Sequence, residues 1–538
     1  MPPRVLTSAT LPRQRGGTAR PRPAGAGGRR GAWGTALAPA LLALALGLWG
    51  LTRRDSMWRD ESVTYQVAHR GTGQIRDLVG HVDAVHGLYY LLMHGLFRVW
   101  DGGLVALRLP SVAATAAAAA LVALTGRRVA GARAGLCAGG VFALAPLVQM
   151  YAQEGRSYAS VCALVALATY LLVRALDGGG RWTWAGYAAA GAAAGWLHEF
   201  AVLALVAHGV TVLTCRTARW ARRRWAVAAG AALAAVAPLA VFSTGQSDQV
   251  SWIGGPGAVQ WAQIAAVMAL GAGCVCCAAR LPRPQGRPAG PVSPARLGLP
   301  LLVLPTALLL AAAVYRPVYL DRYVLYSYVG LALLLGQVLD LLLAYRPAPG
   351  AAAVRRLAPY GVRAVAALAV LSLLPVTLEM RTPESRKDDV AAIARAVRQV
   401  SARGGADGVL FLPARRREWR LSYPGAYRGL RDLALRGTPA GTATLEGVEA
   451  PPAAVARRVL AARRIVALTD PPGQPLDTDR AERAKRALLR DHFTVCARMR
   501  AKGAQVLLYA RPGDCPEAAA PAHGAPVAPC GTRPGAAR

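Results

Sequence analysis

The stretch Met57-Trp58-Arg59-Asp60-Glu61 follows directly on the first long apolar run of the chain, Trp33 to Leu51. Two adjacent carboxylates therefore lie just outside a segment long enough to cross a membrane. Residues 81–90 then add two histidines and a third carboxylate. Ionisable groups at a membrane surface are costly to keep there without a task. We therefore interpret this loop as a candidate catalytic loop at the lipid–water boundary, the alternative being a solvated polar loop.

The composition of the chain indicates a membrane protein. The 538 residues are 54% hydrophobic and only 17% charged, less charge than a soluble protein carries. Apolar runs recur along the first 380 positions, which predicts a mainly α, polytopic membrane bundle. The net charge of +35 comes from Lys and Arg in short loops between these runs, without the interleaved aromatic residues that stack on bases. We therefore expect membrane lipid as a partner and exclude nucleic acid.

Basic residues set the expected orientation. Residues 1–32 carry seven Arg and no acid, which predicts a disordered cytoplasmic leader. If Val85–Trp100 lies on the surface as an amphipathic helix, every Arg-rich loop falls on the side of this leader, as the positive-inside rule requires. The sequence then predicts a multi-pass plasma-membrane protein with a cytoplasmic N-terminus. It has about eleven spans plus surface helices, the spans being 33–51, 107–125, 132–150, 157–175, 183–197, 199–214, 224–243, 260–279, 297–314, 324–344 and 360–379.

The polar region after residue 380 predicts a small extracytoplasmic α/β domain over residues 381–511, with a disordered tail at 512–538. Strands are expected at 408–412, 465–468 and 506–509, and helices at 388–402, 455–464 and 480–490. Cys496, Cys515 and Cys530 fall in this region, where one disulfide can form if the region is extracytoplasmic.

In this topology the loops that mix acids, imidazoles and tyrosines all fall on the outer face. Asp60 or Glu61 suits a general base that takes a proton from an incoming hydroxyl. Arg156, Arg316 or Arg322 suits a phosphate clamp. Together they indicate group transfer from a lipid-linked phosphate. The alternative is a transporter or flippase for a lipid-linked or anionic substrate, whose carboxylates are expected near mid-span.

Four motifs carry a family resemblance: Trp58-x-Asp60-Glu61, Asp83-x-x-His86-Gly87-Leu88-Tyr89-Tyr90, Arg108-Leu109-Pro110-Ser111 and Tyr151-Ala152-Gln153-Glu154-x-Arg156-x-Tyr158. Their order and sidedness resemble the GT-C superfamily of polyprenyl-phosphate-sugar glycosyltransferases. The branch is that of the protein O-mannosyltransferases and lipid A aminoarabinose transferases, including actinobacterial mannosyltransferase-like proteins. The resemblance covers the predicted transmembrane domain, residues 33–380.

The resemblance implies an inverting transfer of a sugar, expected to be mannose, from a polyprenyl-phosphate donor to an acceptor hydroxyl on the outer face. By motif position Asp60 is the catalytic base and Glu61 its neighbour. The implied substrate-binding residues are Asp83, His86, Tyr151, Gln153, Glu154, Arg156, Tyr158, His198, Arg322 and Tyr323. The chain has Asp83-Ala84-Val85-His86 where relatives often carry a His-Pro-Pro-like turn. The acceptor, whether protein, glycan or glycolipid, and any divalent metal cofactor stay open.

Overall fold

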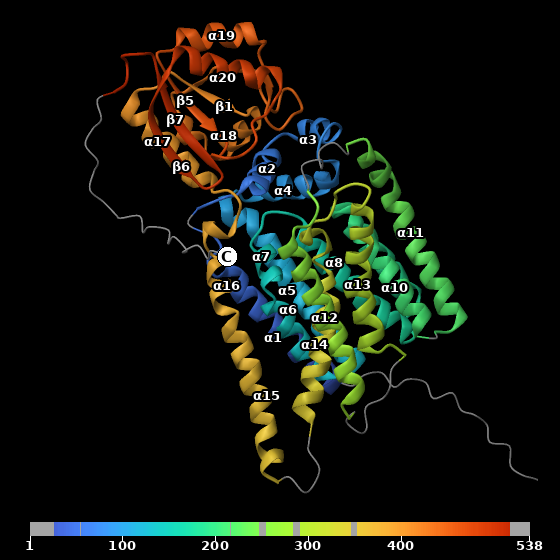
Figure 1. The fold of residues 1–538 in the computed structure, drawn as a ribbon. Helices are drawn as coiled ribbons and strands as arrows, with labels where there is room; N and C mark the ends of the chain where they lie inside the picture. The colour runs from blue at the N-terminus through green and yellow to red at the C-terminus, as the bar shows by residue number, and fades with distance from the viewer. Residues whose placement is uncertain are drawn as a thin grey trace, which may run out of the picture.

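A computed structural model describes residues 26–53, 55–215, 217–246, 254–282, 291–345 and 352–516. Most of the predicted leader and tail, residues 1–25 and 517–538 with Cys530, lies outside the described residues. Figure 1 shows a bundle of long helices with a separate α/β domain at one end.

The bundle is built from apolar helices that run alongside one another (Figure 1). Their bounds are α1 (Ala26–Leu48), α5 (Gly103–Ala130), α6 (Ala132–Leu144), α7 (Pro146–Ala152), α8 (Tyr158–Leu176), α9 (Arg181–Leu197), α10 (Leu203–Thr214), α11 (Arg219–Thr244), α12 (Ala258–Arg280), α13 (Pro294–Ala313), α14 (Ser327–Ala344), α15 (Ala352–Ser372) and α16 (Leu374–Glu379). The short 3₁₀ helices η2 (Glu199–Val202) and η4 (Asp321–Val324) precede α10 and α14. The prediction of a polytopic helical membrane protein is confirmed.

The number of full-length spans differs from the eleven predicted. Among the described residues, 8 helices are long and apolar enough to cross a membrane, or up to 9 if the bent pair α6–α7 is one span. Each of the eleven predicted ranges coincides with helix, but α9 has 17 residues and α10 only 12. At 1.5 Å per residue, helices of this length fall short of a bilayer core about 30 Å thick.

Three short helices lie at the end of the bundle that faces the α/β domain (Figure 1). They are α2 (Arg59–Ala68), α3 (Thr72–Val79) and α4 (Gly87–Val99), the last preceded by the 3₁₀ turn η1 (Ala84–His86). The 13 residues of α4 are too few to cross a bilayer, which agrees with the prediction that this segment does not span the membrane. The loop after α1 therefore folds into short helices that lie between the bundle and the α/β domain.

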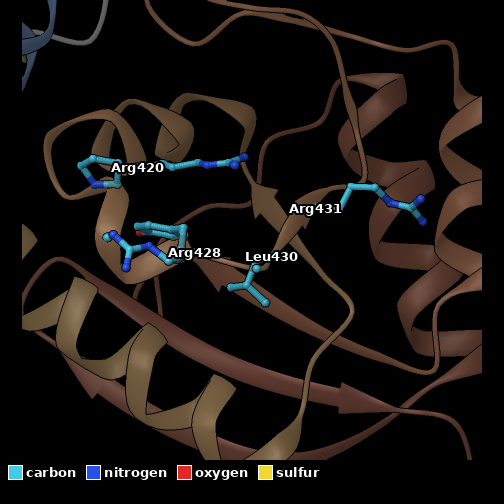
Figure 2. A pocket seen from close by; sticks show the side chains of 8 residues that line it. Arg420, Arg428, Leu430 and Arg431 are labelled. Carbon is cyan, nitrogen blue, oxygen red and sulfur yellow. The ribbon is translucent and has the colours of Figure 1, made fainter.

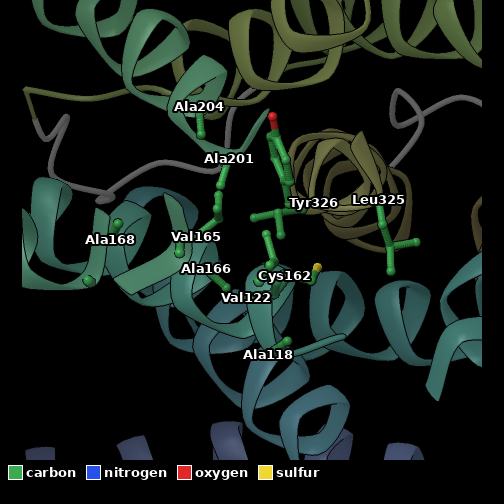
Figure 3. Packing of buried hydrophobic residues seen from close by; sticks show 14 of the residues in the cluster. Ala118, Val122, Cys162, Val165, Ala166, Ala168, Ala201, Ala204, Leu325 and Tyr326 are labelled. Carbon is green, nitrogen blue, oxygen red and sulfur yellow. The ribbon is translucent and has the colours of Figure 1, made fainter. Parts of the chain in front are cut away.

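Small residues let the bundle helices approach one another closely. Figure 3 shows Ala118 and Val122 of α5 against Cys162, Val165 and Ala166 of α8, all buried. Where α13 and α14 cross, a Cβ on Gly330 would lie 2.4 Å from the carbonyl oxygen of Gly298, so that position tolerates no side chain. Because lipid offers no hydrophobic driving force between helices, such close packing is what holds the bundle together.

The C-terminal domain is a three-layered α/β unit. Its five-stranded sheet has the order β2-β1-β5-β7-β6, in which β1 is parallel to β2 and β5, whereas β7 is antiparallel to β5 and β6. A two-stranded sheet pairs β3 with β4. The strands are β1 (Gly408–Leu412), β2 (Arg431–Asp432), β3 (Leu435–Gly437), β4 (Val448–Glu449), β5 (Arg464–Thr469), β6 (Thr494–Ala501) and β7 (Ala504–Ala510).

Helices cover both faces of this sheet. Alternate residues of β1 point to opposite sides: Val409 and Phe411 pack under α17 (Val390–Gly404), whereas Leu410 and Leu412 pack under α19 (Pro452–Ala461) and α20 (Arg480–His492). The short 3₁₀ elements η5 (Pro383–Ser385), η6 (Ala414–Arg417) and η7 (Pro424–Tyr427) and the helix α18 (Glu418–Ser422) complete the domain. The three predicted strands and three predicted helices are all present, within a few residues of their expected bounds.

The α/β domain is joined to the loop after α1 by several polar contacts. Ser56 Oγ donates to Asp389 at 2.7 Å, and the backbone N–H of Met57 donates to the hydroxyl of Tyr423 at 3.1 Å. Ser62 and Ser422 bring α2 and α18 together through their hydroxyls, which are 2.5 Å apart. The domain is thus in direct contact with the helix that carries Asp60 and Glu61.

A disulfide closes the edge of the sheet. Cys496 of β6 is bonded to Cys515, with a sequence separation of 19, as the cysteine positions allowed. The free cysteines of the described chain are those in or at the end of the apolar helices. A cross-link of this loop length restricts the unfolded chain and stabilises the domain by roughly 3 kcal/mol.

Replacing Cys496 and Cys515 together by Ser is expected to lower the unfolding temperature of the α/β domain, and to make it insensitive to reductant. Thermal unfolding of purified protein with and without dithiothreitol measures both. Cys276→Ser, at an exposed free cysteine, is the matched control. An unchanged unfolding temperature in the double variant would contradict the assigned cross-link.

Candidate active site

A cavity of about 570 Å³ opens between the end of the bundle and the α/β domain. Nine of the residues predicted from the sequence line it: Asp60, Asp83, His86, Arg156, Tyr158, His198, Arg316, Arg322 and Tyr323. The α/β domain contributes Arg415, Glu418, Leu445 and Glu446 to the same cavity. The site thus joins segments from four separate places in the predicted outer loops and from the C-terminal domain.

Asp60, in the first turn of α2, is the partly exposed carboxylate of the adjacent pair. Its side chain is 20% exposed, and Arg322 Nη2 lies 3.4 Å from its Oδ2. Arg322 is itself buried, because the ring of Trp58 and that of Tyr158 cover its guanidinium at 5.7 Å each. A carboxylate that faces solvent on one side and a buried cation on the other can accept a proton from a bound hydroxyl.

Arg156 is the second buried cation of the cavity. Its Nη1 donates to the hydroxyl of Tyr90 at 3.1 Å, and that hydroxyl donates to Asp83 Oδ2 at 2.8 Å. Nε of Arg156 is buried without a partner in the described chain. A guanidinium with unused donors in a cavity is suited to an anionic ligand such as phosphate.

His86 and His198 lie in the same wall, their ring centroids 6.0 Å apart. Burial, together with the positive charges of Arg322 and Arg156, lowers the pKa of His198 to about 3. Burial also places the pKa of His86 well below its usual range. Both imidazoles are therefore neutral at physiological pH, and each leaves Nδ1 without a hydrogen-bond partner in the described chain.

Tyrosines fill the space between the cations. Tyr158 accepts a hydrogen bond from Arg322 Nε at 3.2 Å, and its ring lies 6.1 Å from that of Tyr323. Tyr323 in turn lies 4.4 Å from the ring of His198. Tyr151 is set behind them and donates to Asp321 at 3.1 Å. These rings form a rigid wall around the arginines.

Glu61 occupies a different position from its neighbour Asp60. It is fully buried and does not line the cavity. Arg108 donates to both of its oxygens at 2.7 Å, Arg53 lies 2.9 Å away, and the backbone N–H of Gly155 donates at 3.1 Å. Burial alone would raise its pKa, but Arg108 and Arg53 outweigh that cost and hold the pKa at about 2.

Gln153 and Glu154 also lie behind the cavity. Gln153 donates to the carbonyl oxygens of Gly47 at 2.8 Å and Trp49 at 2.6 Å, and so holds the end of α1. Glu154 is buried and forms an ion pair with Arg386 at 3.1 Å. Burial raises its pKa to about 7 in spite of that partner. Two of the predicted substrate-binding side chains thus contact protein and do not face the cavity.

Several residues around the site were not predicted from the sequence. Arg53, Arg108 and Arg386 hold buried carboxylates, and Arg59 of α2 pairs with Glu418 of the α/β domain at 3.3 Å. Arg108 belongs to a quoted motif and Arg59 to the stretch before α2, but the sequence assigned no role to either. Pairing between distant segments has no signature in a single sequence.

The sequence left a divalent metal cofactor open, and the geometry gives no support for one. Among the residues that the structure describes, no three His, Cys, Asp or Glu side chains lie close enough to hold a metal ion.

A separate hollow of about 510 Å³ lies on the α/β domain between α18 and β2. Figure 2 shows Arg420 and Arg428 there, with the side chain of Arg431 pointing away from both. Because the three cations do not converge, this hollow is a poorer anion site than the cavity that contains Arg156 and Arg322.

Replacing Glu61 by Gln is expected to leave Arg53 and Arg108 buried without a counter-charge, which costs roughly 3–5 kcal/mol of stability. Since the pKa of Glu61 is about 2 in the folded protein, below its unfolded value, its contribution is present above pH 4.5 and is lost as the pH falls toward 2. Thermal unfolding in detergent measures the loss, with Asp77→Asn on exposed α3 as control. Equal unfolding temperatures of Glu61→Gln and Asp77→Asn would contradict the assignment.

Comparisons with known proteins agree with this architecture. Residues 88–242 match the family model of dolichyl-phosphate-mannose-protein mannosyltransferases. No curated protein matches the chain in sequence. The structure is similar to crystal structures of ArnT from Cupriavidus metallidurans in the apo state (13% identity) and bound to undecaprenyl phosphate (14% identity). In both cases the TM-score is 0.56, with 89% of this chain and 98% of that chain covered. The expected resemblance is confirmed: the chain is a multi-pass membrane protein with the GT-C glycosyltransferase fold.

Proposed function

We propose that the protein transfers a sugar, mannose, from a polyprenyl-phosphate carrier to an acceptor hydroxyl on the outer face of the membrane. The observation that carries this proposal is the meeting of Asp60 with the buried cations Arg156 and Arg322 in one cavity at the end of the bundle. A base and a phosphate clamp in one cavity are the two parts that such a transfer needs.

The donor phosphate is assigned to the arginine side of the cavity. In the described chain, Arg156 has no carboxylate within ion-pair distance, and Arg322 has only that of Asp60. Neutral His86 and His198 beside them present ring nitrogens to the ligand and do not compete as cations. ArnT of known structure binds undecaprenyl phosphate, which supports a polyprenyl phosphate as the ligand here.

Asp60 is assigned as the general base. Its carboxylate takes the proton of the acceptor hydroxyl while the hydroxyl oxygen forms a bond to the anomeric carbon of the sugar. The bond from that carbon to the phosphate oxygen breaks, and the electron pair leaves with the polyprenyl phosphate, whose charge the arginines stabilise. Displacement from the face opposite the phosphate inverts the anomeric configuration.

Glu61 is assigned a supporting role. Both of its oxygens are occupied by Arg53, Arg108 and Gly155, and its low pKa makes it a poor proton acceptor. The sequence interpretation placed both carboxylates of the pair in the catalytic set, whereas the geometry favours Asp60 alone.

The outer face is assigned to the end of the bundle that carries the cavity. The Arg-rich loops between helices fit a cytoplasmic position under the positive-inside rule. The Cys496–Cys515 disulfide fits an oxidising compartment for the α/β domain. Both observations support an N-terminus inside the cell and a C-terminal domain outside.

The α/β domain is assigned to the acceptor side. It contributes Arg415, Glu418 and Glu446 to the cavity wall opposite the bundle, and Glu418 holds Arg59 next to Asp60. An acceptor hydroxyl that reaches Asp60 therefore passes between the domain and α2. The class of acceptor is left to experiment, since a protein, a glycan and a glycolipid all present a hydroxyl.

Asp60→Asn is expected to lower sugar transfer by about 10²–10⁴-fold, because an amide at this position cannot take the proton of the acceptor hydroxyl. Membranes that contain the protein are supplied with radiolabelled polyprenyl-phosphate mannose, and label in the product is counted at equal expression. Asp77→Asn is the control. Full transfer by Asp60→Asn would contradict the role of Asp60. Transport of the labelled lipid without transfer in the wild type would favour the flippase alternative.

Arg156→Met is expected to weaken donor binding by about 10–100-fold, the loss of one charged hydrogen-bonding group. The apparent KM for the polyprenyl-phosphate sugar measures it. Arg76→Met, at an exposed arginine of α3, is the matched control. An unchanged donor KM would remove Arg156 from the phosphate site.

A further inference from the structure

A second cavity, of about 560 Å³, lies on the other side of α2 from Asp60. Helices α2 and α3 form one wall of it, and the α/β domain forms the other. Its lining includes Tyr65, Gln66, Arg70, Gln74, Leu421 and Thr438.

The contact between α2 and α18 separates this cavity from the first. Asp60 and Val63 of α2 face the first cavity, whereas Tyr65 and Gln66 line the second. The paired hydroxyls of Ser62 and Ser422 lie in the contact between them. The second cavity is therefore a separate place for a ligand.

Gln66 lines this cavity with an amide that the protein does not satisfy. The residue is 6% exposed, and both its Oε1 and its Nε2 are buried without a hydrogen-bond partner in the described chain. A buried amide left without partners is costly, and native structures seldom retain one without a reason. One donor and one acceptor are thus available together.

Arg70 adds a positive charge without a counter-ion. It is 6% exposed, its Nη2 has no partner in the described chain, and its Nη1 makes a single 3.4 Å contact with the carbonyl oxygen of Pro439. The lining includes three arginines and a histidine but no Asp or Glu. Arg417 is already paired with Asp432 and Glu449, and Arg420 lies 3.7 Å from the same Asp432. His69 contacts Asp101 at 3.0 Å. Arg70 is therefore the arginine of the lining that is left for a ligand.

The rest of the lining suits a ring-sized, hydroxyl-bearing group. The aromatic ring of Tyr65 and apolar side chains such as Leu421, Leu435 and Pro439 offer flat surfaces, and Gln74 and Thr438 add polar atoms. An anionic sugar matches this lining. Its charged group suits Arg70, its hydroxyls suit the amides, and its ring suits the apolar wall.

We propose that this cavity binds an anionic saccharide unit, with Arg70 holding its phosphate or carboxylate and Gln66 its hydroxyls. The proposal does not depend on the transferase reaction, because the site is separate from Asp60 and its arginines.

The test is ligand binding to the full-length protein in nanodiscs, followed by saturation-transfer NMR. The probes are glucose 6-phosphate, glucuronate, neutral glucose and a tetraglutamate peptide. The variants are Arg70→Met and Gln66→Leu, with Arg76→Met as the matched control and Arg156→Met to remove anion binding at the first cavity. Unfolding temperatures are measured on the same samples.

The proposal predicts that the two anionic sugars bind, at least tenfold more tightly than glucose. Their binding survives Arg156→Met and Arg76→Met, and it is lost in Arg70→Met and weakened in Gln66→Leu. Both cavity variants keep or raise the unfolding temperature, because each removes an unsatisfied buried group. Binding that is lost only in Arg156→Met, or binding of the peptide in place of the sugars, overturns the proposal. A fall in unfolding temperature in both variants, without sugar binding by the wild type, assigns the two residues to structure alone.

Discussion

The buried cluster around Glu61 is the interaction on which the site depends. One carboxylate accepts hydrogen bonds from Arg108 of α5, from Arg53 of the segment after α1 and from the backbone of Gly155. It therefore joins three parts of the chain that are far apart in sequence, at the end of the bundle where the cavity opens. Buried ion pairs add little net stability compared with apolar packing, but breaking one is costly. The cluster thus fixes where α2 begins, and hence where Asp60 is placed.

Adjacent carboxylates in the first turn of a helix point in different directions, and in this protein each has its own partners. Glu61 faces inward to the arginines, whereas Asp60 faces the cavity and Arg322. The α/β domain secures the same helix from the opposite side through Arg59–Glu418 and Ser62–Ser422. Helix α2 is therefore a wall shared by two cavities and clamped between the bundle and the domain. The α/β domain, which the sequence places after the transmembrane domain, therefore contributes residues to the candidate site.

Apolar periodicity predicted the helices and the β1, β5 and β7 strands, because burial dictates these patterns locally. The apolar pattern overestimated the number of full-length spans, because α9 and α10 are apolar but short. It missed β6, whose arginines at 498 and 500 hide an edge strand. The predicted topology placed Asp60, Arg156 and Arg322 on the same face, and motif position favoured Asp60 as the base, but the sequence kept Glu61 in the catalytic set. The difference between the two carboxylates lies in contacts with Arg53 and Arg108, which only the fold brings near.

We propose that a carrier phosphate binds between Arg156 and Arg322 beside Asp60. The most direct measurement is a structure, by electron cryomicroscopy in nanodiscs, of the protein with polyprenyl phosphate bound. We expect phosphate density within hydrogen-bond distance of both guanidinium groups, with the lipid tail leaving along the bundle. Phosphate density elsewhere, with the cavity beside Asp60 empty, would contradict it.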